Sequence, residues 1–264
     1  MDYQLKNKTA FITGSTSGIG FAVARLLAGE GSKVIINGRD QAGVDHAIAQ
    51  LKQVHETSNV SGLVADFSIK ESVEGLIHQL GFIDILVNNV GIYTSQSFTN
   101  TTDEDWYRLF EVNVMSGVRL ARALLPRMIQ KDSGRIIFVS SECAQLVPDD
   151  LIAYGTTKAA LHSISRGLAQ LTRNTAVTVN TIVPGSTLSE GAKKFLKEAS
   201  VKEQKSEDEV MADFFKSVRT TSLISRFITT EEVAHAVLYL ASPVSAATNG
   251  AVISVDGGSV PGIF

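Results

Sequence analysis

Seven short runs rich in β-branched and apolar residues alternate along the chain with longer segments of helical periodicity. Buried parallel strands produce such runs, because parallel neighbours need crossover connections and helices then cover both faces of the sheet. The pattern predicts an α/β fold with a doubly wound parallel sheet of about seven strands and helices on both faces. The predicted strands are residues 9–13, 33–37, 60–65, 83–88, 135–140, 177–183 and 251–255.

A glycine-rich segment follows the first predicted strand and reads TGSTSGIG at residues 13–20. The next residues show helical spacing, so three glycines lie at the N-terminus of a predicted helix. Backbone N–H groups and the helix dipole favour a phosphate there, and glycine lets a pyrophosphate approach closely. Three spaced glycines alone are a weak signal and could form an ordinary tight turn. Their position between a strand and a helix predicts a dinucleotide phosphate site.

Two stretches interrupt the alternation of strands and helices. Residues 103–131 are long enough for a helix of several turns, which Pro126 should bend or loosen near its C-terminal end. Residues 186–226 are rich in Lys, Glu and Ser and are predicted to form helical pieces outside the sheet. We interpret them as a substrate lid within one domain that spans residues 1–264. The alternative is a solvated insertion, although long excursions in compact domains are usually functional.

Composition excludes several classes of function. The 264 residues are 44% hydrophobic and 19% charged with a net charge of -3, which is typical neither of a disordered chain nor of a nucleic-acid-binding protein. No stretch approaches the roughly 18 uninterrupted apolar residues needed to cross a bilayer. We therefore expect neither nucleic acid nor membrane as a partner.

The cysteine and histidine content bears on location and on metals. Cys143 is the only cysteine, so no intramolecular disulfide can form and a reducing compartment is favoured. The N-terminal residues lack the basic start and apolar run of a signal peptide, and a cytoplasmic location is expected. The five histidines are scattered without ligand spacing, so no metal is expected. Cys143 itself is predicted to be a small buried thiol rather than part of the substrate pocket.

Tyr154 and Lys158 are four residues apart, and a helix would place both on one face. A free tyrosine has a pKa near 10, and a cation at about 4 Å contributes roughly 4 kcal/mol at an effective dielectric constant of 20. The phenol would then titrate nearer neutral pH and could exchange a proton with an alkoxide or an alcohol. Taken alone, such a pair is more often a contact on a helix surface.

The glycine spacing Gly-x-x-x-Gly-x-Gly resembles that of the short-chain dehydrogenase/reductase family, and other motifs follow in that family's order. The chain is similar to members of the 3-oxoacyl-[acyl-carrier-protein] reductase type, and the resemblance extends over residues 8–258. It implies a Rossmann-like fold and an NAD(P)-dependent oxidoreductase that interconverts a carbonyl compound and a secondary alcohol. The motifs are Asp66 after the third strand, NNVG at 88–91, Asn113, Ser141, YGTTK at 154–158, and Pro184-Gly185 after the sixth strand.

The resemblance also implies roles for four catalytic residues. Tyr154 acts as general acid or base, and Lys158 also binds the nicotinamide ribose. Ser141 orients the substrate oxygen. Asn113 holds a water that links Lys158 to solvent, the alternative being a local bond to the backbone. Ser140 competes with Ser141, but adjacent strand residues face opposite ways and the family spacing selects Ser141.

The same resemblance predicts the cofactor contacts. Two positions depart from the family pattern, since Val90 replaces an alanine and Ser189 replaces a threonine that contacts the nicotinamide carboxamide. Asp66 is expected to contact adenine, or alternatively only to begin a loop. The predicted contacts are Gly14, Ser15, Ser17, Gly18, Ile19, Gly20, Arg39, Asp66, Phe67, Asn89, Gly91, Tyr154, Lys158, Pro184, Gly185 and Ser189.

The end of the second predicted strand favours NADP over NAD. An NAD enzyme usually has a carboxylate there for the ribose hydroxyls, whereas this chain has Gly38 followed by Arg39, whose guanidinium suits a phosphate. Asp40 is interpreted as the cap of the next helix, although a ribose contact is the alternative. The glycine-rich segment carries no additional Arg or Lys, so NAD stays possible.

Several questions stay open from the sequence alone. The motifs do not separate a dehydrogenase from a dehydratase or epimerase, or from a non-catalytic nucleotide-binding member of the fold. The substrate, a small carbonyl compound or alcohol, is not identified, although Leu146, Val147, Leu151 and Ile152 suggest a largely apolar pocket wall. The apolar tail at 260–264 and the resemblance together predict a homotetramer.

Overall fold

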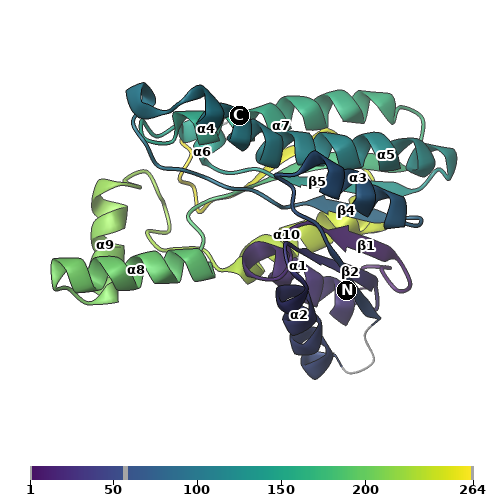
Figure 1. Cartoon of the computed structure of the whole chain (residues 1–264), viewed down its shortest axis with the longest axis horizontal. Helices are drawn as coiled ribbons and strands as arrows, with labels where there is room; N and C mark the ends of the chain where they lie inside the picture. Colours follow the sequence, from purple (N-terminus) through teal and green to yellow (C-terminus); the bar gives the residue numbers. More distant parts are fainter. Residues whose placement is uncertain (1, 56–58, 263–264) are drawn as a thin grey trace.

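The computed structural model describes residues 2–55 and 59–262, in which seven strands form one parallel sheet (Figure 1). The strand order is β3-β2-β1-β4-β5-β6-β7, so the predicted doubly wound α/β fold is confirmed. The strands are β1 Thr9–Ile12, β2 Lys33–Gly38, β3 Val60–Val64, β4 Ile85–Asn88, β5 Gly134–Val139, β6 Val177–Pro184 and β7 Val252–Val255.

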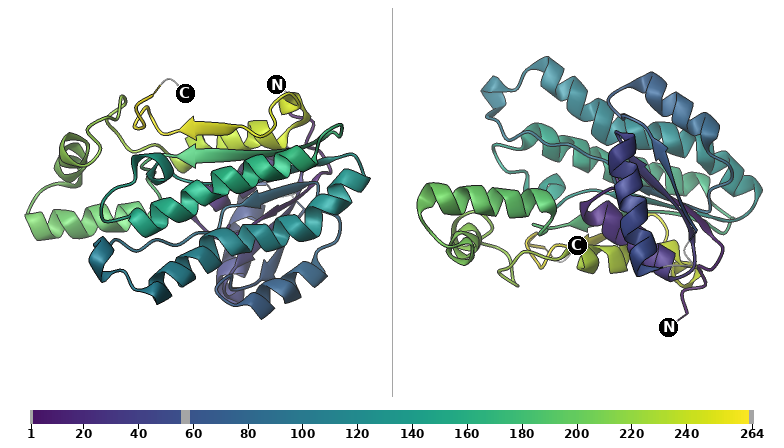
Figure 2. Two further views of the ribbon diagram at one scale, coloured as in Figure 1. Left: turned by 90° about the horizontal axis from the view of Figure 1, so that it is seen from above. Right: turned by 60° about the horizontal axis from the view of Figure 1, so that its bottom comes forward.

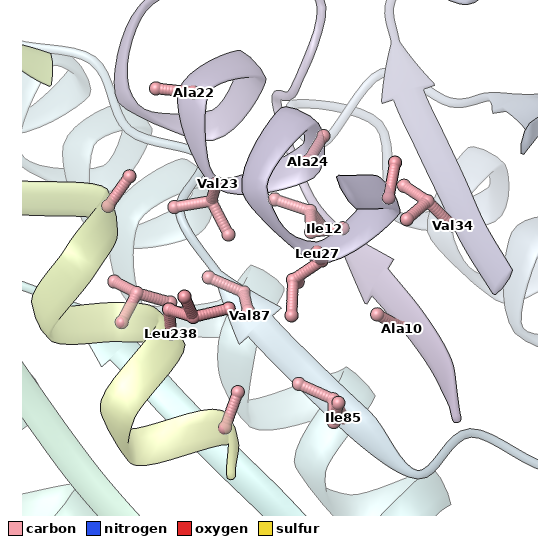
Figure 3. Packing of buried hydrophobic residues seen from close by; sticks show 14 of the residues in the cluster. Ala10, Ile12, Ala22, Val23, Ala24, Leu27, Val34, Ile85, Val87 and Leu238 are labelled. Carbon is pink, nitrogen blue, oxygen red and sulfur yellow. The ribbon is translucent and has the colours of Figure 1, made fainter. Parts of the chain in front are cut away.

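Helices cover both faces of the sheet, and each face has its own hydrophobic core (Figure 2). On one face, Val23 and Leu27 of α1 lie one turn apart and pack with Leu238 of α10 over the strands (Figure 3). In the described ranges, no helix is long and apolar enough to cross a membrane. The helices are α1 Gly18–Gly29, α2 Gln41–Val54 and α10 Thr230–Ala241 on this face, and α3 Lys70–Gln79, α5 Ser116–Gln130 and α7 Ile152–Leu171 on the other.

The long helix expected over residues 103–131 has an irregular centre. Helix α4 (Asp103–Phe110) begins with a capping box at Thr102, a π-helical segment follows at Glu111–Met115, and α5 continues the path. Pro126 lies inside α5, which runs on to Gln130, so the helix continues past the proline although Pro126 has no N–H to donate. A separate departure from α-helical bonding, the π-helical segment, includes Asn113, and π-helical turns frequently mark functional sites.

The 186–226 segment extends beyond the sheet and contains two helices, α8 (Glu190–Glu203) and α9 (Glu207–Ser217) (Figure 1). A small core holds them together, formed by Leu196, Val210, Phe215 and Phe227. The short elements elsewhere are α6 (Cys143–Leu146) and 3₁₀ turns at Phe98–Asn100 and Pro243–Ser245.

The direction in which successive strands are added to the sheet reverses between β1 and β4, which are parallel neighbours. Strands β2 and β3 extend the sheet to one side of β1, and β4 begins the other side. The connections that leave the carboxyl ends of β1 and β4 therefore run in opposite directions and leave a crevice, where open α/β sheets bind their ligands. The glycine-rich segment follows β1 at this edge of the sheet.

Candidate active site

The glycine-rich segment after β1 is fixed by two asparagines. The Gly14 N–H donates to Asn37 Oδ1 at 2.9 Å, and Asn89 Nδ2 donates to the carbonyls of Thr13 and Gly14, each at 2.9 Å. A Cβ on Gly20 would lie 2.5 Å from the Gly14 carbonyl oxygen and 2.6 Å from the Asn89 amide nitrogen. Only glycine fits at position 20, because any side chain would collide with the glycine-rich segment. With no side chain at this position, the N-terminus of α1 is open to a ligand.

Ser15 differs from its neighbours because its polar groups are used inside the protein. Its backbone N–H donates to the Asn37 carbonyl, and its buried hydroxyl donates to the Ile12 carbonyl and accepts from the Asn37 N–H. Ser15 therefore fastens the segment to the sheet and offers neither of these groups to a ligand. Sequence reasoning assigned no role to Asn37, since its position as the last residue of a predicted strand gave no sign of these bonds.

A cavity of about 460 Å³ opens beside the glycine-rich segment. Its walls come mainly from the loops after β1, β2, β3 and β4, so it occupies the crevice described above. Arg108 of α4 and Val112 of the π-helical segment complete the lining. Thr16, Asn37, Gly38 and Val90 also lie in its wall. The predicted cofactor residues that line it are Gly14, Ser17, Arg39, Asp66, Phe67, Asn89 and Gly91.

Arg39 and Asp66 supply the charged groups at one end of this cavity. Arg39 is exposed, and Gly38 before it has no side chain to compete for a ligand. Asp66 Oδ1 accepts bonds from the Ser68 hydroxyl and N–H at 2.7 and 2.8 Å. Those bonds, with a smaller contribution from Arg39, hold the pKa of Asp66 below its ordinary value. Asp66 thus shapes its own loop and also faces the cavity.

The four predicted catalytic residues come from three parts of the fold. Tyr154 and Lys158 lie one turn apart on α7, Ser141 follows β5, and Asn113 lies in the π-helical segment. The amine of Lys158 donates to the Val139 carbonyl at 3.0 Å and lies 5.7 Å from the centre of the Tyr154 ring.

Gly91 lies between Lys158 and Asn113. A Cβ at Gly91 would lie 3.0 Å from Lys158 Nζ and 3.5 Å from Asn113 Oδ1, so a larger residue would displace the amine. Asn113 accepts from the Ile92 N–H at 2.8 Å and donates to the Ile92 carbonyl and the Thr157 hydroxyl. Its amide therefore joins the loop after β4 to α7.

Ser140 and Ser141 have different surroundings. Ser140 is buried, donates to the Lys158 carbonyl and contacts His162 Nε2 at 2.9 Å. Ser141 is half-buried, accepts from the Cys143 N–H at 3.2 Å and lies beside Tyr154, whose pKa it lowers. The Ser140 hydroxyl is thus occupied within the protein, whereas Ser141 adjoins the tyrosine.

Burial changes both pKa values on α7. It raises the pKa of Tyr154 well above its ordinary value, and the neighbouring Ser141 offsets only part of that rise. Burial also lowers the pKa of Lys158 to about 8. The sequence-based expectation that Lys158 brings the phenol near neutral pH is therefore wrong for the protein alone, because the charged forms of both groups are desolvated. A phenol that keeps its proton at neutral pH is ready to act as a proton donor.

The base of the 186–226 segment lies close to the glycine-rich segment. Gly185 donates its N–H to the Val255 carbonyl at 2.9 Å, and the hydroxyl of Ser189 accepts from the Ala192 N–H as the N-cap of α8. A Cβ on Gly18 would lie 3.9 Å from the Ser189 Cβ. The start of α8 therefore faces the N-terminus of α1, which contains the predicted contacts Ile19 and Gly20.

Two charged residues beside the site carried no signal in the sequence. Glu142 follows Ser141 and forms a buried ion pair with Arg219, at 2.6 Å between Nε and Oε1. Their separation along the chain gave no reason to pair them. Cys143 is buried, as expected, and burial raises the pKa of its thiol. Among the described residues, no group of His, Cys, Asp and Glu could hold a metal ion.

Comparisons with known proteins agree with the fold and the motifs. The family model described as "short chain dehydrogenase" matches residues 8–200. An uncharacterized oxidoreductase, YvaG, from Bacillus subtilis (strain 168) is 45% identical over 264 residues, which is all of both chains. D-beta-hydroxybutyrate dehydrogenase from Cupriavidus necator is 32% identical over 97% of this chain and 99% of its own. L-sorbose reductase from Gluconobacter frateurii, solved with NADPH and L-sorbose, has a TM-score of 0.93 and 31% identity over the whole of both chains.

Proposed function

Since this chain belongs to the short-chain dehydrogenase/reductase family and is an NAD(P)-dependent oxidoreductase acting on CH–OH donors, we propose that Tyr154 is its proton donor or acceptor. The reaction is the interconversion of a carbonyl compound and a secondary alcohol. The observation that carries the proposal is the placement of Ser141 beside Tyr154, with the buried amine of Lys158 one turn away and 5.7 Å from the centre of the tyrosine ring.

The cavity suits a dinucleotide. Open backbone groups at the N-terminus of α1, a helix of 12 residues without acidic side chains in its first turn, favour a pyrophosphate. Asp66 and Phe67 lie in the wall where an adenine would bind, and Arg39 lies at the cavity's exposed end. Gly91, Pro184, Gly185 and Ser189 extend the proposed contacts toward Tyr154, although the Ser189 hydroxyl also caps α8.

The chain's own groups perform the proton transfer. Bound NAD(P)H supplies the hydride that the carbonyl carbon accepts. Ser141 orients the carbonyl oxygen, and the Tyr154 hydroxyl donates its proton to that oxygen as negative charge develops. The cation of Lys158 stabilises the phenolate that remains. In the oxidation direction the same groups act in reverse, and the phenolate takes the proton of the alcohol.

The experiment that tests this function is a carbonyl panel assayed with NADPH and NADH by absorbance at 340 nm. The panel contains ketoses, 3-oxoacids, 3-oxoacyl thioesters, steroids and small ketones, because relatives act on L-sorbose or on D-beta-hydroxybutyrate. We expect at least one class to be reduced with net consumption of cofactor. A protein that binds NADPH but consumes none across the panel would contradict the proposal.

Arg39 is the proposed reader of the 2'-phosphate, so the enzyme should prefer NADPH. One charge-assisted bond is worth about 1.5 to 3 kcal/mol, which predicts a preference of roughly 10- to 150-fold in kcat/KM. Asp40 is engaged elsewhere, since its Oδ1 caps α2 by accepting from the Gly43 N–H at 2.8 Å, as the sequence predicted. Arg39→Ala should remove most of the preference, measured as the ratio of kcat/KM for the two cofactors.

The control for Arg39 is Arg173→Ala, which removes an exposed arginine distant from the cavity lining. It should leave the cofactor ratio unchanged. A wild-type preference for NADH, or an unchanged ratio in Arg39→Ala, would rule out the phosphate contact and make Asp40 the next residue to examine.

We also propose that residues 186–226 form the substrate lid and that the protein is a homotetramer. The lid proposal rests on α8 and α9, which extend from the edge of the sheet that carries the site. The apolar tail supports the tetramer, although its last residues, Ile263 and Phe264, lie outside the described residues. Light scattering at micromolar concentration should give about four times the 28.3 kDa of one chain. A mass of one chain would refute the tetramer.

A further inference from the structure

Glu142 and Arg219 form an ion pair that is almost completely withdrawn from water. Their side chains are 3% and 11% exposed, and Arg219 Nε donates to Glu142 Oε1 at 2.6 Å. Glu142 is the residue after Ser141, and Arg219 comes just after α9, near the end of the 186–226 segment. The pair therefore joins the catalytic serine loop to the far end of the proposed lid.

Glu142 also holds the beginning of the same segment. The Ser186 hydroxyl donates to Glu142 Oε1 at 2.9 Å, and the Glu142 N–H donates to the Pro184 carbonyl at 2.8 Å. Backbone bonds between Ser186, Leu188 and Ile228 close the base of the segment independently of the ion pair. The carboxylate of Glu142 thus binds both ends of the proposed lid, and Glu142 is itself the residue after the proposed catalytic serine.

Arg219 in turn connects to the small core that unites α8 and α9. Its guanidinium lies 5.7 Å from the centre of the Phe214 ring, which stacks on Phe227 at 5.1 Å between ring centres. Phe215 packs edge-on against both rings. A displacement of Arg219 would therefore be transmitted to the body of the lid rather than absorbed in a loose loop.

A contribution to the stability of the fold does not by itself explain why the Glu142–Arg219 ion pair is buried here. Desolvation of two charges offsets much of their attraction, and well-packed apolar residues often serve as well or better. In the described part of the chain, Glu142 Oε2 is buried without a hydrogen-bond partner, which adds to the cost. By contrast, Arg226 and Glu232 pair at 2.7 Å on the surface nearby, where such pairs contribute little.

We propose that Glu142 and Arg219 are positioning residues that hold the lid against the Ser141 loop and thereby set the affinity for the carbonyl substrate. The inference rests on the proposed function, because it assumes that substrate binds between the lid and Tyr154. Neither Glu142 nor Arg219 is proposed to contact the carbonyl group of the substrate or the hydroxyl of Tyr154. It acts by keeping α8 and α9 in place, so its loss should weaken substrate binding more than it slows the chemical step.

The first test is Arg219→Met, which keeps the length of the side chain and removes its charge. Since small displacements of positioning groups can cost up to about 100-fold, we expect KM for the carbonyl substrate to rise roughly 10- to 100-fold. NADPH affinity, measured by fluorescence titration, should change less than about 3-fold, because the base of the lid keeps its backbone bonds. Arg219→Lys should recover part of the KM. Arg25→Met, which breaks a partly exposed ion pair with Glu231 outside the lid, is the control and should leave KM unchanged.

A double variant separates positioning from stability. Glu142→Gln with Arg219→Met leaves no unpaired buried carboxylate, so its melting temperature should return toward that of the wild type. Its KM should stay raised, because the link between the lid and the loop is still absent. If its KM returns to the wild-type value along with its stability, the pair has only a structural role. An unchanged KM in Arg219→Met would also overturn the proposal.

A readout without turnover keeps this inference distinct from the proposed function. Hydrogen exchange of the backbone amides in α8 and α9 should be at least about 10-fold faster in Arg219→Met than in wild type, whereas strand amides should be unchanged. If no compound of the carbonyl panel is reduced but this acceleration is observed, the proposed function is refuted, whereas the positioning role of Glu142 and Arg219 is supported. If Arg219→Met exchanges at wild-type rates, the positioning role is refuted.

Discussion

Tyr154→Phe should lower kcat by roughly 10² to 10⁴-fold, because a positioned proton donor typically contributes that much. The variant keeps the ring, which packs edge-on against Tyr93 at 6.0 Å between ring centres, and removes only the hydroxyl beside Ser141. NADPH affinity should be nearly unchanged, since the cavity walls lie mainly in the loops after β1 to β4. Steady-state kinetics and a fluorescence titration of NADPH measure the two effects separately.

The matched control is Tyr93→Phe, which removes an exposed hydroxyl beside the same site and preserves the ring contact. It should keep kcat within about 3-fold of wild type. If Tyr154→Phe retained more than about a tenth of the wild-type rate, another group would have to donate the proton. The assignment of Tyr154 would then be wrong.

Lys158→Met should abolish turnover and yet stabilise the cofactor-free protein. Lys158 is 3% exposed, and burial lowers its pKa from 10.5 to about 8. That difference corresponds to roughly 3 kcal/mol that protonation of the buried amine costs the folded state. Methionine removes this cost but leaves the Val139 carbonyl without its donor, so the net gain at pH 7 should be about 1 to 2 kcal/mol. Loss of the cation should lower kcat at least about 100-fold.

The pH dependence of this stability gain has a definite sign. The folded-state pKa of Lys158 lies below the unfolded value, so the unfolded chain binds more protons between about pH 8 and 10.5. The free energy of unfolding of the wild type therefore rises over that range. Its difference from the free energy of unfolding of Lys158→Met should become smaller. Urea unfolding at pH 7 and pH 10 measures this, with Lys70→Met, an exposed lysine on α3, as the control. A variant less stable than wild type at pH 7, with no pH trend, would contradict the account.

The fold could be predicted because its signals are local. Each buried strand appears as a short apolar run, and helix boundaries such as the cap at Asp40 depend on residues a few positions apart. The first and last residues of the strands could be predicted less exactly. The fourth strand begins at Ile85 rather than at residue 83, although the backbone of Asp84 already bonds Thr9 and Arg135 of the neighbouring strands.

The features that the sequence missed depend on distant parts of the chain. Asn37 fastens the glycine-rich segment through bonds to Gly14 and Ser15, and nothing near Asn37 indicates them. The partner of Glu142 lies 77 residues away on the lid. The spacing of Tyr154 and Lys158 does place both on one face of α7, but spacing cannot reveal burial. Burial raises the pKa of Tyr154, whereas the sequence predicted a lower value, and it lowers the pKa of Lys158.

Hydride transfer from NADPH to the carbonyl carbon of the substrate can be followed directly with deuterium. The enzyme is supplied with NADPH dideuterated at C4 of the nicotinamide ring and with a carbonyl compound that it reduces, and the alcohol is analysed by mass spectrometry. We expect one deuterium on the carbinol carbon for each NADPH consumed. A product that forms without deuterium, or without consumption of NADPH, would exclude hydride transfer and indicate an epimerase or a dehydratase.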